Sequence, residues 1–250
     1  MGKRKPVDMS AVASGYTMMT CAELARSLGV SRSTARRRLV EAGIQITSER
    51  RKRRSLTNKE KGLLVGMALG DSSFAAGRPN DTPRLVLSHS ATQEEYLDHK
   101  ASLLIEILGP TRKYRRSRLD ARTGKTYHEV SIGTRSHSFL TELRDMMRPG
   151  VSGKQATDEA LSLLTVEGLA IWYCDDGSLY QGDVRHLNIA TQSYNNKAGV
   201  IGRIRELTGV TFKTTSQGSI RITNKADIVR FLAVVSPFIH TSMNYKKCVN

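Results

Sequence analysis

The sequence contains few cysteines and no long apolar run. Its three cysteines, Cys21, Cys174 and Cys248, are far apart and form no metal-spaced pair. Disulfides and a structural zinc site are therefore not expected, and a reducing cytosol fits. Apolar runs such as 232–235 are too short to span a bilayer. The amino terminus, MGKRKPVDMSAVASG, lacks the apolar core of a secretory signal. We therefore expect a cytoplasmic protein with no membrane association.

Acidic residues are also scarce relative to basic ones. The chain of 250 residues has 39 Lys and Arg against 23 Asp and Glu, for a net charge of +16. Residues 1–56 alone hold 13 basic and 4 acidic side chains. With 39% hydrophobic and 25% charged residues, the composition is that of a folded globular protein. A polyanion is the expected partner, and the phosphate backbone of nucleic acid is the commonest one.

Residues 17–46 predict a small helical unit. Thr20 and Ser31 are suited to cap two short helices, and Gly29 between them is suited to the turn. This is the pattern of a helix-turn-helix domain, expected over 1–46, whose second helix would enter a major groove. A helical hairpin used only for packing is the alternative. The outward-facing residues expected to contact DNA are Arg32, Ser33, Arg36 and Arg37.

Residues 47–56, TSERRKRRSL, predict a basic linker, because runs of like charge do not fold alone. The linker is either a solvated tether or a tether that also follows phosphates through Arg51, Arg53 and Arg54. Both interpretations can hold at once.

Residues 57–250 contain an internal repeat. GLLVGMALGDSSF (62–74) and GLAIWYCDDGSLY (168–180) both run from an apolar stretch into an aspartate, and Asp71 and Asp176 are 105 residues apart. After each aspartate comes the same order of patterns: two strands, a helix, a hairpin and a closing helix. We therefore predict an α+β fold in which two pseudo-symmetric αββαββα repeats follow the small all-α domain. In the first repeat (57–157), the second strand, helix, hairpin strands and closing helix are expected at 84–90, 92–108, 113–119 with 127–133, and 136–148. In the second repeat (158–250), they are expected at 186–193, 195–207, 211–216 with 219–223, and 224–239.

Three glycines lie on one face of the first apolar helix, at Gly62, Gly66 and Gly70. Each costs about 1 kcal/mol relative to alanine in a helix interior. Such a cost indicates that another element approaches that face closely. We expect this element to be the second apolar helix, where Ala170 and Cys174 offer small residues at the same spacing. The two repeats would then join into a monomer with an internal pseudo-dyad.

Asp71 and Asp176 would end these two helices side by side. Two converging carboxylates at helix C-termini repel each other unless a cation lies between them. Oxygen ligands, with no His or Cys expected at the site, favour Mg²⁺, with Mn²⁺ as a substitute. The backbone of the adjacent Ser72 and Gly177 is expected to contribute. A metal between two carboxylates and a phosphodiester can activate water for hydrolysis.

The two segments resemble the signature of the LAGLIDADG homing endonucleases. Residues 64–72 and 169–177 match the motif positions, and the second segment resembles the branch written LAIWY-x-DDGSL. SHSATQEEYLDHK (88–100) and MNYKK (243–247) resemble that branch as well. The copies depart from each other at Gly66 against Ile171 and at Gly70 against Asp175, so an asymmetric helix interface is expected.

The resemblance implies a double-strand DNA endonuclease. Each sheet would form part of a saddle in the major groove, and Asp71 and Asp176, as catalytic acids, would act across the intervening minor groove and leave short 3′ overhangs. Gln192 would position water, with His89 as its imperfect counterpart. Candidates for the basic catalytic role are Arg221, Lys225 and Lys246, although 245–246 can also be read as ordinary packing.

The hairpins carry the residues expected to contact DNA. The first hairpin is rich in arginine and lysine, and alternation places these on different faces, so not all of them can touch DNA. The second hairpin is richer in small hydrogen-bonding side chains, which indicates an asymmetric target. The alternative is a solvated basic hairpin. The predicted contacts are Lys113, Arg115, Arg116, Arg118, Lys125, Arg185, Lys213, Thr215, Gln217 and Arg221.

Two other functions stay open at this point. A non-catalytic transcriptional regulator could combine a LAGLIDADG-like domain with a helix-turn-helix, although the presence of both acids favours an enzyme. An intron-splicing maturase with the same fold is the other alternative. A site-specific endonuclease needs double-stranded DNA and Mg²⁺ but no obligate protein partner, and we expect a bacterial or phage gene more than an organellar one.

Overall fold

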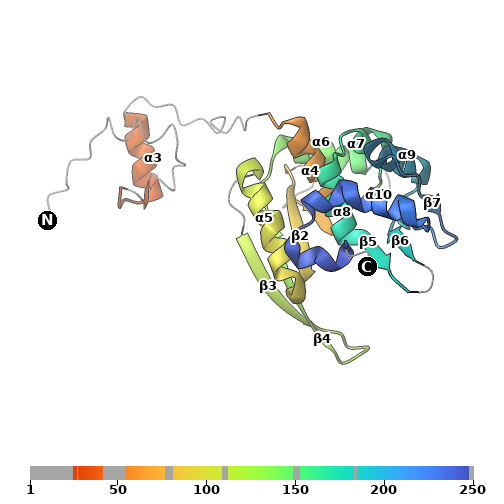
Figure 1. Cartoon of the computed structure of the whole chain (residues 1–250). Coiled ribbons are helices and arrows are strands. Elements are labelled where there is room, and N and C mark those ends of the chain that lie inside the picture. The colour runs from red at the N-terminus through yellow and green to blue at the C-terminus, as the bar shows by residue number, and fades with distance from the viewer. Residues whose placement is uncertain are drawn as a thin grey trace. The chain divides into compact units, whose positions relative to one another are not determined.

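The computed structural model describes residues 25–26, 28–41, 55–76, 81–108, 112–148, 153–182 and 185–247. The chain divides into two units, Met1–Arg54 and Ser55–Asn250, each of which is treated by itself (Figure 1). Helices within the described ranges are not long and apolar enough to cross a bilayer. The predicted four-part division of the chain stays a prediction.

The described part of the first unit is built around α3 (Arg32–Glu41). Ser31 caps this helix, since its Oγ accepts a hydrogen bond from the Thr34 N–H at 3.1 Å. Ala35 and Leu39 are fully buried, as expected for the inward face. Gly29 has a φ of 60°, which glycine adopts without strain, and turns the chain into the helix. The first helix of the predicted helix-turn-helix lies largely outside the described residues.

The second unit contains two copies of one element order, as the repeat predicted. The first copy comprises α4 (Asn58–Leu69), β1 (Ser72–Ala75), β2 (Arg84–Ser90), the 3₁₀ turn η2 (Ala91–Gln93), α5 (Glu94–Leu108), β3 (Arg112–Leu119), β4 (Thr126–Gly133) and α6 (Ser138–Met147). A short helix, α7 (Asp158–Ser162), precedes the second copy: α8 (Val166–Asp176), β5 (Gly177–Tyr180), β6 (His186–Ile189), α9 (Lys197–Thr208), β7 (Lys213–Thr214), β8 (Ile220–Ile222) and α10 (Lys225–Val235). The 3₁₀ helices η3 (Ser236–Phe238) and η4 (Thr241–Lys246) follow. The order αββαββα is therefore confirmed in both repeats.

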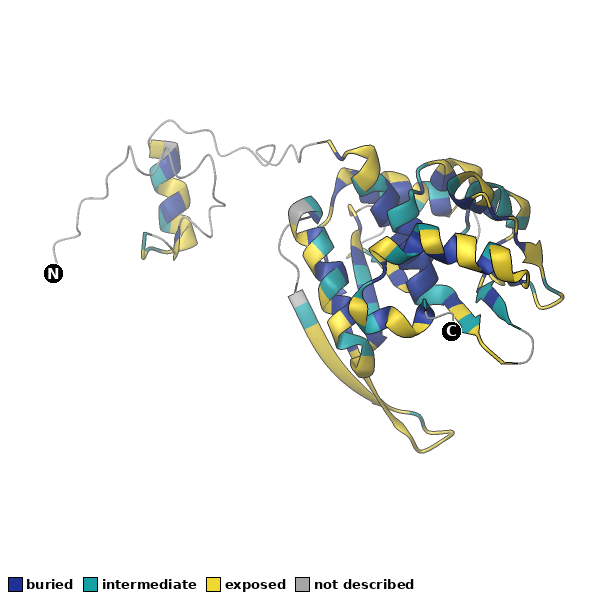
Figure 2. Ribbon diagram, in the orientation of Figure 1, coloured by how far each residue is buried: buried dark blue, intermediate teal, exposed yellow. Residues whose placement is uncertain are grey.

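Both sheets are antiparallel and share one strand order, β1-β2-β4-β3 and β5-β6-β8-β7. The register is equivalent as well, because Ser72 pairs with Leu87 and Gly177 pairs with Ile189. The hairpins differ in length: β3 and β4 have 8 residues each, while β7 and β8 have 2 and 3. Figure 1 shows the long hairpin extending beyond the body of the unit, and Figure 2 shows its exposure.

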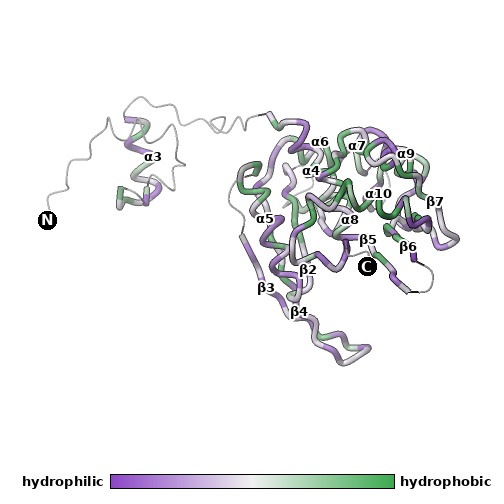
Figure 3. Tube along the Cα trace, in the orientation of Figure 1, coloured by the Kyte–Doolittle hydropathy of each residue, from purple (hydrophilic) through white to green (hydrophobic). Residues whose placement is uncertain are grey.

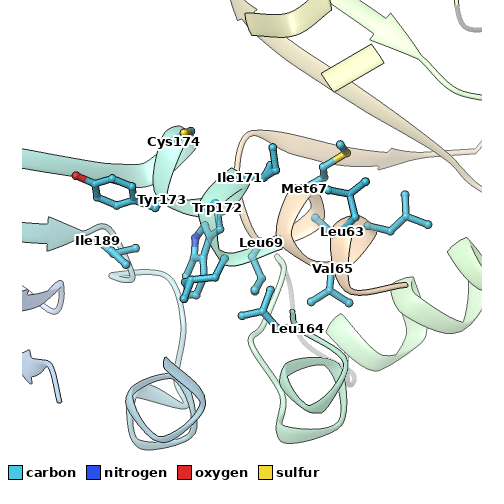
Figure 4. Packing of buried hydrophobic residues seen from close by; sticks show 14 of the residues in the cluster. Leu63, Val65, Met67, Leu69, Leu164, Ile171, Trp172, Tyr173, Cys174 and Ile189 are labelled. Atoms are coloured by element: carbon cyan, nitrogen blue, oxygen red, sulfur yellow. The ribbon is translucent and has the colours of Figure 1, made fainter. Parts of the chain in front are cut away.

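The helices α4 and α8 pack against each other at the centre of the unit. Residues 62–69 of α4 and 168–174 of α8 are all buried, which explains why both segments are apolar on every side. Thr57 begins α4 with a capping box to Glu60, and the Thr165 side chain caps α8. Figure 4 shows side chains of both helices filling the core between the repeats.

The glycines of α4 face a different part of α8 than the sequence predicted. A Cβ on Gly62 would overlap the Thr165 side chain, one on Gly66 would overlap the Gly168 carbonyl, and one on Gly70 would overlap the Asp175 carboxylate. The expected partners, Ala170 and Cys174, are therefore wrong. Both are buried, but small residues on more than one face of α8 left the direction of contact open. The expected asymmetry at Gly70 and Asp175 is confirmed.

A tyrosine from each repeat ties it to the opposite central helix. Tyr96 on α5 donates its hydroxyl to the Ile171 carbonyl at 3.3 Å, and Tyr194 before α9 donates to the Leu69 carbonyl. The two repeats thus share one continuous core that holds the ends of α4 and α8 in a fixed relation.

Candidate functional site

Asp71 and Asp176 lie where the two central helices end. Asp176 is the last residue of α8, and Asp71 follows Gly70, the residue that caps α4. The Asp71 backbone N–H donates to the carboxylate of Asp175 at 3.0 Å, which ties the two helix ends together. The Asp71 side chain is 46% exposed, so this carboxylate remains open to solvent.

The environment of Asp176 is electrostatically unfavourable for a carboxylate. Burial, followed by the charges of Asp71 and Asp175, raises the pKa of Asp176 to about 6. The indole of Trp172 opposes this shift, because its Nε1–H donates to Asp176 Oδ2 at 3.0 Å. A cation shared by Asp71 and Asp176 would relieve the repulsion. A hard divalent ion such as Mg²⁺ therefore fits this set of oxygen donors.

Two lysines flank the acids in equivalent places. Lys154 donates from Nζ to the carbonyl oxygens of Gly70 and Ser72, both at 2.7 Å. Lys246 donates to the carbonyl oxygen of Gly177 at 2.6 Å, and this lysine is buried. Burial lowers the pKa of both ammonium groups, and the nearby aspartates oppose that effect. The carbonyl oxygen of the residue after each acid, Ser72 or Gly177, thus accepts a hydrogen bond from a lysine ammonium. A metal cation at either oxygen would be repelled by that ammonium.

Lys154 was missed by the sequence analysis. Lys246 lies 70 residues after Asp176, whereas Lys154 lies 83 residues after Asp71, because the first repeat has the longer hairpin. A constant offset of 105 residues from Lys246 leads to Thr141, which lies in α6. The sequence pattern that could have identified Lys154 is a lysine after the closing helix of each repeat: Lys154 follows α6, and Lys246 follows α10.

A histidine lies beside the first acid. The metal-ligand argument, which expected a site without histidine, was wrong on this point, whereas the family resemblance had already named His89 as a candidate. His89 on β2 is 5% exposed, and its Nδ1 lies 3.7 Å from Asp71 Oδ2. Burial and the charge of Lys100 lower the pKa of His89 and favour the neutral ring. The β-sheet register makes Thr191 the counterpart of His89, because the Ser88 and Ala190 N–H groups donate to the Asp71 and Asp176 carbonyls. The predicted pairing of His89 with Gln192 is therefore wrong.

The other residues predicted to act in catalysis are not all close to the two acids. Gln192 is exposed in the turn after β6 and packs against Gly218. Lys225 is the first residue of α10 and is exposed. Arg221 on β8 donates from Nε to Asn188 Oδ1 at 2.9 Å. Of the predicted basic residues, Lys246 is the one that the structure brings beside an acid.

Strand alternation separates the residues of the first hairpin into two faces. Val130 and Ile132 are buried against the helices, and their ladder partners Arg115 and Lys113 share that face. Both basic side chains pair there with Glu94. The opposite face, which points away from the helices and is called the open face, carries Arg116 and Arg118 with the exposed aromatic residues Tyr114 and Tyr127. Figure 3 shows the hydrophilic character of β3.

The sheet of the second repeat has an equivalent open face. The ladder Lys213, Arg221, Asn188 and Ser178 runs across it. A surface hollow brings Lys213, Thr215 and Arg221 together. The sequence did not predict Asn188 or Arg84 as DNA contacts, although both lie on open faces. Their strands were predicted, but which side chains of each strand face away from the helices was not.

Other predicted DNA contacts are scattered. Lys125 and Gln217 are exposed in the turns of the two hairpins. Arg185 precedes β6 and has a buried Nη1 without a hydrogen-bond partner among the described residues. In α3, four predicted residues are exposed, and Arg37 pairs with Glu41 at 3.5 Å. The predicted contacts that are exposed on α3 are Arg32, Ser33, Arg36 and Arg37; Arg51, Arg53 and Arg54 lie outside the described residues.

The sequence of the chain was compared with protein families and with known proteins. The sequence profile of the LAGLIDADG DNA endonuclease family matches residues 61–219. The chain is similar to DNA endonuclease I-ChuI of Chlamydomonas applanata, with 29% identity over 77% of this chain and 95% of that protein. It is also similar to the protein RecA of Mycobacterium shimoidei, with 27% identity over 76% of this chain and 47% of that protein.

A solved structure shares the fold. It is that of the homing endonuclease I-WcaI bound to its DNA recognition sequence, with a TM-score of 0.67 and 20% identity. The similarity covers 84% of this chain and 97% of that protein. The mixed α/β architecture with two antiparallel sheets is common to both.

Proposed function

The chain belongs to the LAGLIDADG DNA endonuclease family, a group of phosphodiester hydrolases, and on that premise we propose that it is a site-specific, Mg²⁺-dependent double-strand homing endonuclease. The observation that carries the proposal is the meeting of Asp71 and Asp176 at the ends of two packed helices, where the pKa of Asp176 is raised to about 6. The charge of Asp71 disfavours ionisation of Asp176, and a divalent cation bound by both acids would relieve that repulsion.

Asp71 and Asp176 would hold the metal, with Mn²⁺ as a substitute for Mg²⁺. When bound, the metal supplies an activated water and stabilises the leaving oxygen. Lys154 and Lys246 place positive charge beside the two acids, where negative charge develops on the phosphate during hydrolysis. Their ammonium groups also hold the carbonyls that follow the acids, which fixes the backbone at both centres.

The open faces of the two sheets would bind the major groove on either side of the acids, so that both strands are cut across the minor groove. Arg116 and Arg118 on the long hairpin supply phosphate contacts. The pair of Arg221 on β8 and Asn188 on β6 supplies a fixed set of hydrogen-bonding groups for base edges. Because the hairpins differ in length and chemistry, the target is proposed to be long and asymmetric, bound by a monomer.

The first unit is proposed to be a helix-turn-helix domain that extends the footprint. The exposed arginines of α3 form its recognition surface, and the basic segment 47–56 tethers it to the second unit. Tethering two DNA-binding modules raises the effective affinity through local concentration. We propose that the protein is associated with DNA in the cell and serves intron homing.

The experiment is cleavage of a library of DNA duplexes in Mg²⁺, with sequencing of the product ends. Discrete double-strand cuts with 3′ overhangs are expected, and EDTA should stop them. Asp71→Asn and Asp176→Asn should each abolish cleavage and leave specific binding intact. Specific binding without any cutting by the wild type would overturn the proposal in favour of a DNA-binding regulator.

A further inference from the structure

Asp175, next to the proposed catalytic Asp176, makes all of its side-chain hydrogen bonds with the other repeat. Its side chain has no exposed surface. Lys100 on α5 donates from Nζ to both carboxylate oxygens, at 2.9 and 2.7 Å. The single hydrogen of the Tyr96 hydroxyl is shared between Oδ1, at 3.1 Å, and the Ile171 carbonyl, at 3.3 Å, and the Asp71 N–H donates to Oδ2 at 3.0 Å. Two donors on each oxygen saturate the carboxylate.

This saturation separates Asp175 from the proposed metal ligands. Ligand atoms of Asp71, His89 and Asp175 lie within 4.8 Å of one another, which by itself resembles a metal site. The fully buried ammonium of Lys100 already lies in that cluster, 3.1 Å from His89 Nε2. A metal bound there would have to displace a paired cation. The cluster therefore functions as an ion pair.

Lys100 also orients the histidine beside Asp71. An ammonium group only donates, so His89 Nε2 must accept, and the ring hydrogen is left on Nδ1. Nδ1 is the atom that lies 3.7 Å from Asp71 Oδ2. The ion pair thus holds Asp71 through its backbone N–H, and it orients the histidine that faces the Asp71 carboxylate.

The second centre has no equivalent arrangement. Gly70 stands where Asp175 stands in the other motif, and it has no side chain to accept hydrogen bonds. The crossing tyrosine of the second repeat, Tyr194, donates to the Leu69 carbonyl and not to a carboxylate. Asp176 is oriented instead by Trp172 of its own helix.

We propose that Asp175 and Lys100 form an inter-repeat clamp that positions Asp71, so that the first catalytic centre depends on the second repeat and the two DNA strands are cut by inequivalent centres. This inference rests on the proposed nuclease function. Asp175 and Lys100 are positioning residues, because they act on Asp71 and not on the DNA.

The test measures both strand-cleavage rates in a single-turnover reaction on a duplex selected by the wild type, with each strand labelled separately. The decisive variant is Asp175→Asn with Lys100→Met, which removes both charges and leaves no unpaired ion in the core. We expect the ratio of the two strand rates to change by about tenfold or more, because small displacements of a catalytic group have large rate effects. The Kd for the duplex in Ca²⁺ should stay within about threefold of wild type, since these buried residues do not face DNA.

The matched variant is Trp172→Phe, which removes the hydrogen bond to Asp176 and should shift the ratio of strand rates in the opposite direction. Lys100→Arg keeps a cation in the clamp and should restore part of the wild-type ratio. If the ratio of the two strand rates is unchanged in the double variant, whether or not both strands are slowed equally, the clamp proposal is overturned. The proposed nuclease function would still stand. A wild-type protein that cuts no duplex would remove both proposals together.

Discussion

Gly66 and Gly168 are in backbone contact across the two central helices. A Cβ atom on Gly66 would overlap the Gly168 carbonyl, and one on Gly168 would overlap the Gly62 carbonyl. The contact sets the separation of α4 and α8, and with it the separation of Asp71 and Asp176 at their ends. The spacing of the two proposed catalytic acids therefore depends on residues that have no side chains.

Gly66→Ala should destabilise the protein strongly, because backbone cannot move aside as a flexible side chain can. We expect a loss of about 2–4 kcal/mol in the free energy of unfolding, within the range of severe overpacking. Gly202→Ala in α9 is the control, since nothing lies within 4 Å of its added Cβ. That change should be neutral or stabilising by up to about 1 kcal/mol. Urea unfolding of both variants checks this, and equal effects would contradict the role of Gly66.

Asp176→Asn should stabilise the metal-free protein at neutral pH. Burial and the charges of Asp71 and Asp175 raise the pKa of Asp176 from its ordinary 3.8 to about 6. A raised pKa means that the folded state favours the protonated carboxyl. The protonated Asp176 therefore contributes its full stability below the pKa that it has in the unfolded chain, and this contribution is lost as pH rises through about 6. Asn carries no charge at any pH. Relative to wild type, the variant should therefore gain about 1–3 kcal/mol between about pH 4 and pH 7.

The measurement is urea unfolding in EDTA across that pH range. Asp145→Asn on α6 is the control, because its side chain is 63% exposed and its effect on the free energy of unfolding should be small. Added Mg²⁺ should narrow the gap between wild type and Asp176→Asn by binding the wild type. A stability difference that does not depend on pH would contradict the electrostatic description of Asp176.

Lys154→Met and Lys246→Met should each slow cleavage more than they weaken DNA binding. Both ammonium groups lie beside the acids, and removal of one charge at a transition state typically costs about 100-fold or more. Lys59→Met is the control, since Lys59 lies in the first turn of α4, at the opposite end from Asp71. Single-turnover rates and Kd in Ca²⁺ separate the two effects. A loss confined to binding would show that the lysines only contact phosphate.

The repeat architecture was predictable because it depends on local pattern. Apolar helices that end in aspartate, alternating strands and turn residues recur in one order, and the structure keeps that order. The contact face of α8 was not predictable. Ala170, Cys174 and Gly168 are all small, and the sequence does not state which of them α4 approaches.

The residues around the acids were predictable only in part, for two physical reasons. The pair of Lys100 and Asp175 joins positions 75 residues apart, and neither residue signals the other. Lys154 was hidden by the longer hairpin of its repeat, which shifts everything after it relative to the second copy. The predicted site therefore lacked Lys100 and Lys154, because the first depends on long-range pairing and the second on unequal hairpin length.

Arg116→Ala and Arg118→Ala should weaken DNA binding and reduce its salt dependence. Both side chains lie on the open face of the long hairpin. Loss of one phosphate contact lowers the slope of log K against log salt by about 1. Arg115→Ala is the matched comparison, because its side chain lies on the helix face with Glu94 and should change the slope less. Equal slopes for Arg115→Ala and Arg116→Ala would contradict the assignment of the open face.

Removal of residues 1–54 should weaken binding without removing cleavage. The cut is placed there because Leu56 is 7% exposed in the core of the second unit, and Thr57 caps α4 with Glu60. The remaining unit keeps both acids and both flanking lysines, so single-turnover cleavage at saturating enzyme should stay within about threefold of wild type. Its Kd should rise and its salt slope should fall, since the lost segment is strongly basic. A longer deletion, of residues 1–57, removes the cap and should cost about 1 kcal/mol of stability as well. A truncated protein that binds as tightly as the full chain would show that the first unit makes no contact with this DNA.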